Sequence, residues 1–498
     1  MMLALSLFGL ISLVEVMIWT GWLWSARKYL SGLVLVSLAL ISGYLFGVHA
    51  SLWTAVIVYI TLFRVINLLK LIENRITGDH LYFSTQRTSL TLILSQLSVI
   101  LVAYINSQLL ISQHYWLYVI GGLQLIAAII VVLSTLRHIK HSRSREIIKT
   151  TSDRDLPTVT VAIPARNETD DLKLCLQSLI ESDYPKLEII VLDDCSQLRK
   201  TPETIRSFAQ SGVKFVAGET PPEHWLAKNY AYKQLVTASS GEFILFCGVD
   251  ARFDRDSIRL IIEDMLDRHK DMISVIPINR LPDSHRAESL ILQTNRYAWE
   301  LALPRKLVNR PAILSTCWLI KHDTLQQFGG FDAIAGSISP ESYFARQAIK
   351  HNDSYAFVAS SNFGAVYSHK LLYEQQQTAI RTRYPQLHRQ PEVTATVALS
   401  ELLFLVLPLL MTVISLITAD WTLLLISLVS YLLQAYAYSA IARFTYRKFQ
   451  FRSLWLFPVA AVYDVYMLLY SMWQYEFGTV VWKDRNICLP LMQYVDYR

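Results

Sequence analysis

The sequence predicts an α/β domain that is flanked on its N-terminal and C-terminal sides by transmembrane α-helices. Of the 498 residues, 53% are hydrophobic and only 17% are charged, whereas soluble domains carry about 25% charged residues. The apolar excess lies at the two ends of the chain, and the middle alternates strand-like with helix-like patterns. A single core stops growing at ~250–300 residues, so a chain of this length is expected to form several folding units.

Five apolar runs precede the middle domain, and each is long enough for a helix to cross the bilayer, which takes about 20 residues. The runs cover residues 2–24, 30–48, 52–69, 90–111 and 115–136. Lys and Arg follow the first, third and fifth runs, and the two other loops carry neither residue. The positive-inside rule therefore predicts that the N-terminus lies outside and that the residues after Leu136 lie in the cytosol. A cleaved signal peptide is not expected, because the first run lacks a basic leader.

The C-terminal apolar region contains a helical hairpin, residues 394–418 and 421–442, and a third run, residues 454–475. The third run is rich in aromatic residues and contains Pro458, so it either spans the membrane or lies along its interface, and we favour the interface. Ionisable residues inside apolar runs are costly to bury and often functional, although an arginine there can also extend its side chain to the interface. These residues are Glu15, Arg64, Glu401 and Asp464.

Composition and motifs argue against several other classes of protein. The five cysteines form neither a CxxC pair nor a zinc-ligand spacing, so they are expected to be reduced and mostly buried, as in a cytosolic compartment. The net charge of +6 is too small to indicate a nucleic-acid partner. The sequence also lacks the GxxxxGK[ST], post-strand GxGxxG, HExxH and GxSxG motifs of nucleotide hydrolysis, Rossmann redox chemistry, zinc proteolysis and α/β-hydrolases.

The middle domain shows the alternation that is typical of a parallel sheet with helices on both faces. Strands are predicted at residues 158–163, 187–192, 213–216 and 242–247, and helices at residues 168–182, 204–210 and 228–238. Three of the strands are followed by polar or acidic residues, namely Arg166 and Asn167, Asp193 and Asp194, and Asp250. The carboxyl ends of parallel strands meet at one edge of a sheet, so these side chains are expected to form a site.

A site of this composition suits a polar, anionic small molecule together with a divalent cation, because a hard metal ion bridges carboxylates and phosphates. The alternative is that Asp193 and Asp194 cap the turn that follows their strand. The residue pattern leaves both interpretations open.

Short motifs along the chain then carry a family resemblance. They read VAIPARNE (161–168), LDDCS (192–196), HWLAKNYA (224–231), GEFILFCGVDARF (241–253), FGGF (328–331), PESYFAR (340–346), RTRY (381–384) and WKDR (482–485). In this order and spacing, the motifs resemble those of family 2 glycosyltransferases with the GT-A fold. The resemblance covers about residues 157–385 and the C-terminal tail.

The resemblance implies roles for individual residues. Asp250 matches the second Asp of the Asp-x-Asp motif, which holds a divalent metal, Mg²⁺ or Mn²⁺, at the donor diphosphate. Contacts to the nucleotide-sugar donor are implied for Arg166, Asn167, Glu168, Asp193, Asp194, Lys228, Arg381 and Arg383. Trp482 and Arg485 match the Trp-Lys-Gly-Arg ending of membrane-anchored members.

Three positions depart from the family pattern. Gly248 replaces the first Asp of Asp-x-Asp, Ala227 replaces a Gly before Lys228, and Ser342 stands where the catalytic base Asp is expected. A serine hydroxyl does not take a proton from a sugar hydroxyl at neutral pH, whereas a carboxylate does. Glu341 is therefore the candidate base, provided that the loop is displaced by one residue. The alternative for Glu341 is a carboxylate that the helix dipole favours at a helix N-terminus.

The sequence thus predicts a multi-pass protein of the inner or plasma membrane. Its predicted parts are five transmembrane helices at 1–136, a basic linker at 137–156, a cytosolic GT-A domain at 157–391, C-terminal helices at 392–475 and a cytosolic tail at 476–498. The resemblance implies metal-dependent, inverting transfer of a sugar from a nucleotide sugar to a lipid, polyprenyl-type or other membrane-presented acceptor. The alternative is a catalytically degenerate subunit that serves as a scaffold for a membrane-protein partner. A transporter is not favoured, because the two halves of the chain show no repeat.

Overall fold

The computed structural model describes residues 113–143, 151–280, 286–303, 311–352, 354–361, 364–387, 389, 391–447, 452–476 and 479–488, and seven helical positions between 33 and 44. Contacts divide the chain into two compact units. One comprises Met1–Ile120 and Arg389–Leu399, and the other comprises Gly121–His388 and Ser400–Arg498. Apart from those seven positions, the first four predicted N-terminal spans lie outside the described residues, as do Glu15 and Arg64.

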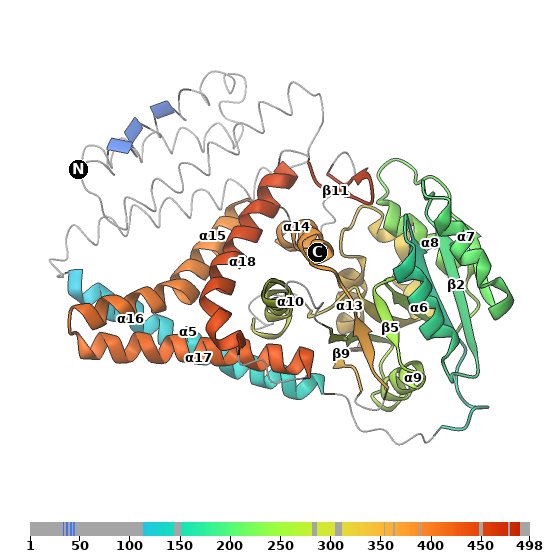
Figure 1. Cartoon of the computed structure of the whole chain (residues 1–498), viewed down its shortest axis with the longest axis horizontal. Coiled ribbons are helices and arrows are strands. Elements are labelled where there is room, and N and C mark those ends of the chain that lie inside the picture. The colour runs from blue at the N-terminus through green and yellow to red at the C-terminus, as the bar shows by residue number, and fades with distance from the viewer. Residues whose placement is uncertain are drawn as a thin grey trace. The chain divides into compact units, whose positions relative to one another are not determined.

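A seven-stranded sheet in the order β3-β2-β1-β4-β8-β6-β9 forms the centre of the second unit (Figure 1). Its strands are β1 (Val159–Ala165), β2 (Leu187–Asp193), β3 (Val213–Ala217), β4 (Phe243–Cys247), β6 (Met272–Ile276), β8 (Cys317–Lys321) and β9 (Tyr355–Ala359). A smaller sheet in the order β5-β10-β7 contains β5 (Ala251–Phe253), β7 (Ile278–Asn279) and β10 (Val366–Ser368).

The first four strands pair in parallel, and their ends lie within two residues of the predicted ends. β8 lies outside the strands that the sequence predicts and is antiparallel to both β4 and β6, so the complete sheet is mixed. The register pairs Cys317, the first residue of β8, with Cys247, the last residue of β4. The chain thus leaves β6 and enters β8 at the same edge of the sheet, and the strand has to run in the opposite direction.

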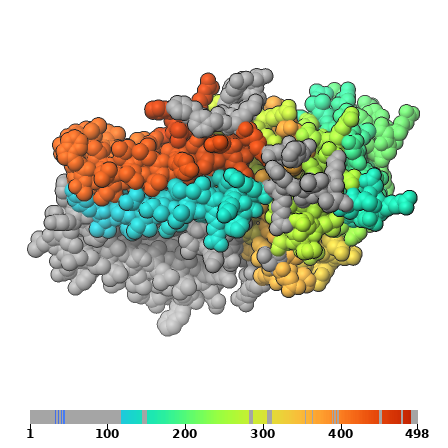
Figure 2. Space-filling view, turned by 90° about the horizontal axis from the view of Figure 1, so that it is seen from below, coloured from blue at the N-terminus to red at the C-terminus, as the bar shows by residue number. Residues whose placement is uncertain are grey.

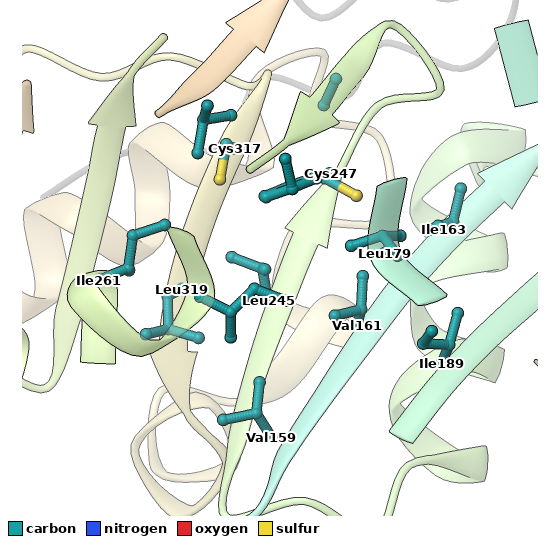
Figure 3. Close-up of a cluster of buried hydrophobic side chains, with 14 of the residues drawn as sticks. Val159, Val161, Ile163, Leu179, Ile189, Leu245, Cys247, Ile261, Cys317 and Leu319 are labelled. Atoms are coloured by element: carbon teal, nitrogen blue, oxygen red, sulfur yellow. The ribbon is translucent and has the colours of Figure 1, made fainter. Parts of the chain in front are cut away.

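Helices cover both faces of the large sheet. One face packs against α6 (Asp170–Ile180), α7 (Lys200–Ser207) and α9 (Ser257–Asp267), and the other against α8 (Ala227–Ala238), α10 (Arg286–Leu301), α12 (His322–Gln327) and α13 (Pro340–Lys350). Short 3₁₀ helices cover Ala209–Ser211 and Gly330–Ile334. In Figure 3, Leu179 of α6 lies close to Val161 of the sheet, and Ile261 of α9 lies close to Leu319. All five cysteines are free, and four of them are buried.

An aromatic cluster on the second face fixes the strand that leads to the candidate site. The rings of Phe246 in β4 and Trp318 in β8 stack with their centroids 4.2 Å apart, and Tyr232 of α8 packs edge-on against Phe246 at 4.9 Å. All three side chains are fully buried. The cluster joins α8, which carries Lys228, to β4, which ends just before Asp250, so the positions of these two residues are coupled.

Among the described residues, four helices are long and apolar enough to cross a membrane, namely Leu117–Ser142, Val397–Ile417, Trp421–Tyr446 and Arg452–Tyr475. The first belongs to α5 (Gln113–Ser142), the third is α17 (Trp421–Tyr446) and the fourth belongs to α18 (Arg452–Glu476). The second runs from α15 (Pro391–Glu401) through the π-helical segment Leu402–Val406 into α16 (Leu407–Ile417). The fifth N-terminal run and the C-terminal hairpin of the prediction are therefore helical. Asp420 caps α17 by accepting a hydrogen bond from the backbone N of Leu423 at 3.1 Å.

Helix α5 lies alongside α16 and α17 (Figures 1 and 2). The side-chain amide of Gln124 in α5 donates to the backbone oxygen of Leu403 at 2.7 Å. Gly121 lets the helices approach closely, because a Cβ at this position would lie 3.2 Å from Ile426. Large apolar side chains such as Leu133 and Leu425 remain exposed on these helices, as lipid-facing residues do.

Helix α18 packs against the central domain on one face and exposes apolar side chains on another. Asp464 accepts a hydrogen bond from the indole N of Trp299 at 2.7 Å, and the backbone oxygen of Ala460 accepts one from Asn295 at 2.9 Å. The exposed apolar residues are Trp455, Val459, Val462, Tyr466 and Trp473. This spacing places an apolar stripe along the helix, which is typical of contact with a membrane.

The aromatic cluster leads to a prediction about stability. Phe246→Ala is expected to lower the free energy of unfolding by about 3–5 kcal/mol, because it leaves a cavity between buried rings. Leu174→Ala is the matched control, since Leu174 is 50% exposed and its truncation is expected to cost less than about 0.5 kcal/mol. Denaturation of the purified protein in detergent measures both values, and similar losses for the two variants would contradict the prediction.

Candidate active site

Residues that follow β1 and β2 are joined at the carboxyl edge of the large sheet. Arg166 is buried, and its Nη1 donates to the backbone oxygens of Asp194 at 2.7 Å and Cys195 at 2.6 Å. Asn167 has a φ of 52°, a left-handed conformation that Asn adopts more readily than most residues. Its Oδ1 accepts from the backbone N of Gln197 at 2.9 Å. These bonds hold the two loops together as one rigid edge.

The C-terminal tail folds into a short β-hairpin, Val481–Asn486, which we call the tail hairpin. It consists of β11 (Val481–Trp482) and β12 (Arg485–Asn486), and its two turn residues, Lys483 and Asp484, have φ values of 49° and 63°. Both values are those of a two-residue type I′ turn. Asp484 stands where the Trp-Lys-Gly-Arg motif has glycine, the residue that adopts this conformation at the lowest cost.

Both turn residues of the tail hairpin contact the strand ends. The Lys483 ammonium lies 2.6 Å from Oε1 of Glu168, and Asp484 accepts a hydrogen bond from the Asn167 amide at 2.9 Å. The backbone oxygen of Lys483 accepts from Nε of Arg166 at 2.8 Å. These three partners are residues for which the family resemblance implies donor contacts. The tail hairpin therefore forms a wall of the candidate donor site.

Asp194 is buried and is bound by Arg485 of the tail hairpin. Nη1 of Arg485 lies 2.8 Å from each carboxylate oxygen. Burial raises the pKa of Asp194, and the charges of Arg485 and Arg166 offset only part of this effect. Asp193 is less buried, and its Oδ1 accepts from the backbone N of Ser196 at 3.2 Å, which is a turn-capping arrangement. The two adjacent acids thus have different partners.

Asp250 follows β4 and is held from two sides. Its Oδ2 accepts from the Ser368 hydroxyl at 3.1 Å and lies 3.9 Å from the ammonium of Lys370. Burial raises the pKa of Asp250, but the charges of Lys370 and Arg296 and the hydrogen bond from Ser368 outweigh burial, and the pKa lies below its usual value. A Cβ at Gly248 would lie 2.4 Å from Oδ1 of Asp250. The glycine that replaces the first Asp of the motif therefore makes room for this carboxylate.

Asp250 offers one carboxylate ligand to a divalent metal. In the part of the chain that the structure describes, no three His, Cys, Asp or Glu side chains gather as a metal cage. Mg²⁺ is commonly held by one or two carboxylates together with substrate phosphates. The residues present therefore fit a metal ion that binds together with a diphosphate, rather than one held by protein ligands alone.

Positive charge dominates the surroundings of Asp250 and Glu341. Four cations interact electrostatically with one another and with these two acids, namely Lys228, Arg296, Lys370 and Arg381. Burial lowers the pKa of Lys228, while the charges of Glu341 and Asp250 act in the opposite direction. Burial also lowers the pKa of Lys370, to about 8. Cations that crowd together away from water favour the binding of an anion.

Glu341 lies in the first turn of α13, beside Ser342. It is buried, and its Oε2 has no hydrogen-bond partner. Its position in the first turn agrees with the helix-dipole interpretation. Its charge acts on Lys228 together with that of Asp250, which agrees with a role in the same site. The backbone N of Ser342 donates to Ser339 at 3.0 Å as part of the helix start.

Helix α14 (Leu372–Gln386) carries the two arginines of the RTRY motif, and they have different partners. The guanidinium of Arg381 lies over the ring of Trp482 at 4.8 Å, a cation–π contact that ties α14 to the tail hairpin. Arg383 binds Asp464 of α18 at 2.5 Å and lies over the ring of Trp299 at 4.6 Å. Arg381 thus belongs to the strand-end site, and Arg383 joins α14 to α18.

Four residues of the site were not predicted from the sequence: Arg296, Ser368, Lys370 and Lys483. Ser368 ends β10 and Lys370 follows two positions later, so the strand-end rule would have found both had the smaller sheet been predicted. Lys483 lies within the WKDR motif, and only the fold brings it to Glu168. Arg296 lies inside α10 and carries no local sequence signal.

Comparisons with known proteins identify the class of the domain. The family model described as Glycosyl transferase family 2 matches residues 160–329. A 4,4'-diaponeurosporenoate glycosyltransferase of Staphylococcus aureus is 31% identical over 122 residues, which are 24% of this chain and 32% of the relative. The match thus spans about a third of that relative's length.

Two solved structures are also similar. A mannosyltransferase from Pyrobaculum calidifontis, in complex with GDP-Man and Mn²⁺, has a TM-score of 0.43 and 16% identity, covering 72% of this chain and 98% of that one. Glucosyl-3-phosphoglycerate synthase from Mycobacterium tuberculosis has a TM-score of 0.31 and 14% identity, covering 49% and 87%.

Residues 160–329 are therefore a family 2 glycosyl transferase domain, which is a domain of enzymes. Its mixed sheet is of the GT-A type, and helices that are long and apolar enough to span a membrane flank it on both sides. The predictions of the family and of the fold class are thereby confirmed.

The pair Asp194–Arg485 leads to a second prediction. Asp194→Asn and Arg485→Gln should each lower the free energy of unfolding by about 1–3 kcal/mol, because each leaves a charged partner without its charge-assisted bond. The double variant should lose little more than either single variant, since one interaction is removed in all three. Unfolding in detergent measures the cycle. The exposed pair Lys233–Asp332 is the control and should show almost no coupling; additive losses for Asp194 and Arg485 would show that they do not stabilise each other.

Proposed function

We propose that the protein is a membrane-associated glycosyltransferase that transfers a sugar from a nucleotide sugar to a lipid or polyprenyl-type acceptor. The observation that carries the proposal is the cluster of cations around Asp250, at the strand ends of a family 2 glycosyl transferase domain. A departing nucleoside diphosphate develops negative charge, and fixed cations in a water-poor site stabilise that charge. The neighbouring membrane-type helices support an acceptor that is presented by the bilayer.

In this proposal, the donor lies across the carboxyl edge of the sheet. Arg166, Asn167, Glu168 and the tail hairpin enclose the nucleoside end, since their mutual bonds fix the walls there. Lys228 and Arg381 face the diphosphate as cations. Preformed side chains of this kind lower the entropy that a ligand loses on binding.

Asp250 is the residue that would hold Mg²⁺ or Mn²⁺ at the diphosphate. When bound, such a metal supplies Lewis-acid stabilisation of the leaving phosphate oxygens. Asp250 is suited to this role because its lowered pKa keeps the carboxylate ionised at neutral pH. Ser368 orients the carboxylate through its hydroxyl.

Glu341 is the residue that we propose as the base for an acceptor hydroxyl in an inverting transfer. Its carboxylate is buried beside Lys228 with one oxygen unpartnered, so it can accept a proton. Ser342 does not fill this role, because a hydroxyl is not basic at neutral pH.

The acceptor and the membrane topology belong to the same proposal. The relatives named 4,4'-diaponeurosporenoate glycosyltransferase support an acceptor of lipid-like character. The distribution of Lys and Arg around the apolar runs supports a cytosolic domain and an N-terminus outside the membrane. A scaffold that binds a membrane-protein partner without turnover is the second candidate, and the departure at Ser342 favours it.

The metal assignment leads to a third prediction. Asp250→Asn is expected to abolish the metal-dependent part of nucleotide binding while the protein stays folded, because the amide removes the anionic ligand. Binding of a panel of nucleoside diphosphates to the protein in detergent, with Mg²⁺, Mn²⁺ or EDTA, measures the effect. Asp332→Asn, at an exposed position, is the control and should bind as the wild type does. Unchanged metal-dependent binding in Asp250→Asn would remove the assignment.

The base assignment leads to a fourth prediction. Glu341→Gln keeps the shape and removes the basicity, so turnover should fall by roughly 10²–10⁴-fold with donor binding intact. Sugar transfer from a panel of radiolabelled nucleotide sugars measures turnover, and Glu242→Gln, a half-exposed carboxylate, is the control. If the wild type is active and Glu341→Gln is equally active, Glu341 is not the base. If the wild type binds no donor and transfers no sugar, the scaffold is the better explanation.

A further inference from the structure

A polar pocket lies between α10 and α14, next to the candidate active site. Its walls include Gln293 and Arg296 of α10, Gln375 and Arg383 of α14, and Lys370. The enclosed part of the pocket is small, with a volume of about 20 Å³, and it opens into a wider space of about 380 Å³ that includes solvent. Lys370 also lies 3.9 Å from Asp250, so the pocket adjoins the place where the reaction is proposed to occur.

The pocket carries three positive charges, and the described lining residues include no acid. Two of these charges have a carboxylate nearby, since Lys370 faces Asp250 and Arg383 binds Asp464. The third belongs to Arg296, whose hydrogen bond is a long one of 3.5 Å to the hydroxyl of Thr316. The ion pairs of the described residues leave Arg296 without a carboxylate at salt-bridge distance. A guanidinium in this situation is a ready partner for a carboxylate or a phosphate.

Gln375 supplies an independent observation in the same pocket. Only 5% of this residue is exposed, and its amide nitrogen donates to the backbone oxygen of Lys370 at 2.9 Å and to Ser289 at 3.3 Å. Its Oε1, however, is buried without a hydrogen-bond partner. An unpartnered buried carbonyl costs about 1–3 kcal/mol unless a donor reaches it. A ligand that brings a hydroxyl or an ordered water into the pocket would satisfy it.

The two helices that form the pocket also bind the membrane-type helix α18. Asn295 and Trp299 of α10 bond to α18, and the hydroxyl of Tyr475 in α18 donates to the backbone oxygen of Arg381 in α14 at 2.8 Å. α18 in turn exposes its apolar stripe, which begins at Trp455. The pocket therefore lies in the layer of the protein between Asp250 and a helix suited to contact with lipid.

We propose that this pocket binds the oxyanionic head group of the lipid acceptor, a carboxylate or a phosphate monoester on a long apolar chain, through Arg296. The inference rests on the proposed function, because it assigns one substrate of that reaction. Arg296 acts as a specificity-determining residue. It selects an anionic lipid over a neutral alcohol, and Lys370 adds a second positive charge, while an ordered water beside the head group would donate to Oε1 of Gln375.

The experiment measures lipid retention by the full-length protein in detergent, without any donor. The probes are farnesyl phosphate, farnesoic acid and farnesol, which share one apolar chain and differ in the head group. The wild type should retain at least one of the two anions about 10–100-fold more tightly than farnesol, the range of a charge-assisted hydrogen bond. The anion that is retained more tightly identifies the source of the oxyanion.

Arg296→Gln should lose this preference while binding farnesol as before, and its affinity for nucleoside diphosphates should fall less than its affinity for the anionic lipid. Arg296→Lys, which keeps the charge, should retain part of the preference, and its thermal transition controls for folding. Arg206→Gln is the matched control, because Arg206 of α7 lies over the ring of Phe215 on another part of the domain. Equal retention of all three lipids by the wild type would overturn the proposal. So would an Arg296→Gln variant that keeps the lipid preference and loses nucleotide binding, since Arg296 would then serve the donor.

The design separates failure of this inference from failure of the proposed function. If the wild type prefers an anionic lipid but transfers no sugar from any nucleotide sugar, the pocket assignment holds and the glycosyltransferase proposal fails. If sugar is transferred equally well to farnesol and to the two anions, the glycosyltransferase proposal holds and the pocket assignment fails. In the transfer assay, Arg296→Gln should raise the KM for the anionic lipid by a larger factor than the KM for the donor.

Discussion

The structure depends on three ion pairs that are buried at or near the carboxyl edge of the sheet. An isolated charge in such a place costs several kcal/mol, so it is stable only with a partner of opposite charge and good geometry. Three pairs meet this need: Asp194 with Arg485, Asp250 with Lys370, and Arg383 with Asp464. The two acids at the sheet edge and their basic partners come from segments far apart in sequence, and the third pair joins α14 to α18. The glycosyl transferase domain is therefore completed by residues well outside the segment that the family model matches.

This requirement explains how the C-terminal region is integrated with the domain. Helix α18 supplies Asp464 to Arg383, and the tail hairpin supplies Arg485 to Asp194. If the C-terminal segment moved away, each of these contacts would be broken and a buried charge of the domain would be left unpaired. The domain, α18 and the tail hairpin belong to one compact unit, as this dependence requires. A wall of the candidate donor site and the support of the proposed acceptor pocket thus come from the same stretch of chain.

The parts of the fold that were predictable are those with a local signal. β1 to β4 follow from short apolar runs, three of which are followed by polar residues, and α6 follows from the spacing of Leu172, Cys175, Leu176 and Leu179, which face the core. The start of α7 was missed, because the helix begins at Lys200 in a polar segment with little periodicity. β8 was not predicted at all, and its direction would not have followed from its residues, since the residue pattern of a buried strand is the same in either direction.

The site was predictable to the extent that its residues follow predicted strands. Arg166, Asn167, Asp194 and Asp250 were found in this way. Arg296 and Lys370 were not, because their position depends on long-range packing of α10 and β10 that no local motif encodes. Roles taken from the resemblance alone, such as donor contacts for Arg383, stay predictions. In the structure, Arg383 forms an ion pair with Asp464.

The departure at Gly248 follows from the same need for charge balance. An acid at this position would place a third carboxylate beside Asp250 and Glu341, and its Cβ alone would lie 2.4 Å from Oδ1 of Asp250. With glycine there, the carboxylate of Asp250 occupies the space and accepts the bond from Ser368. The cations at the centre of the site then outnumber the acids, and the excess charge is available to a phosphate or a carboxylate. Glycine at position 248 therefore removes one possible carboxylate ligand, and it leaves the site better suited to bind anions through its positively charged side chains.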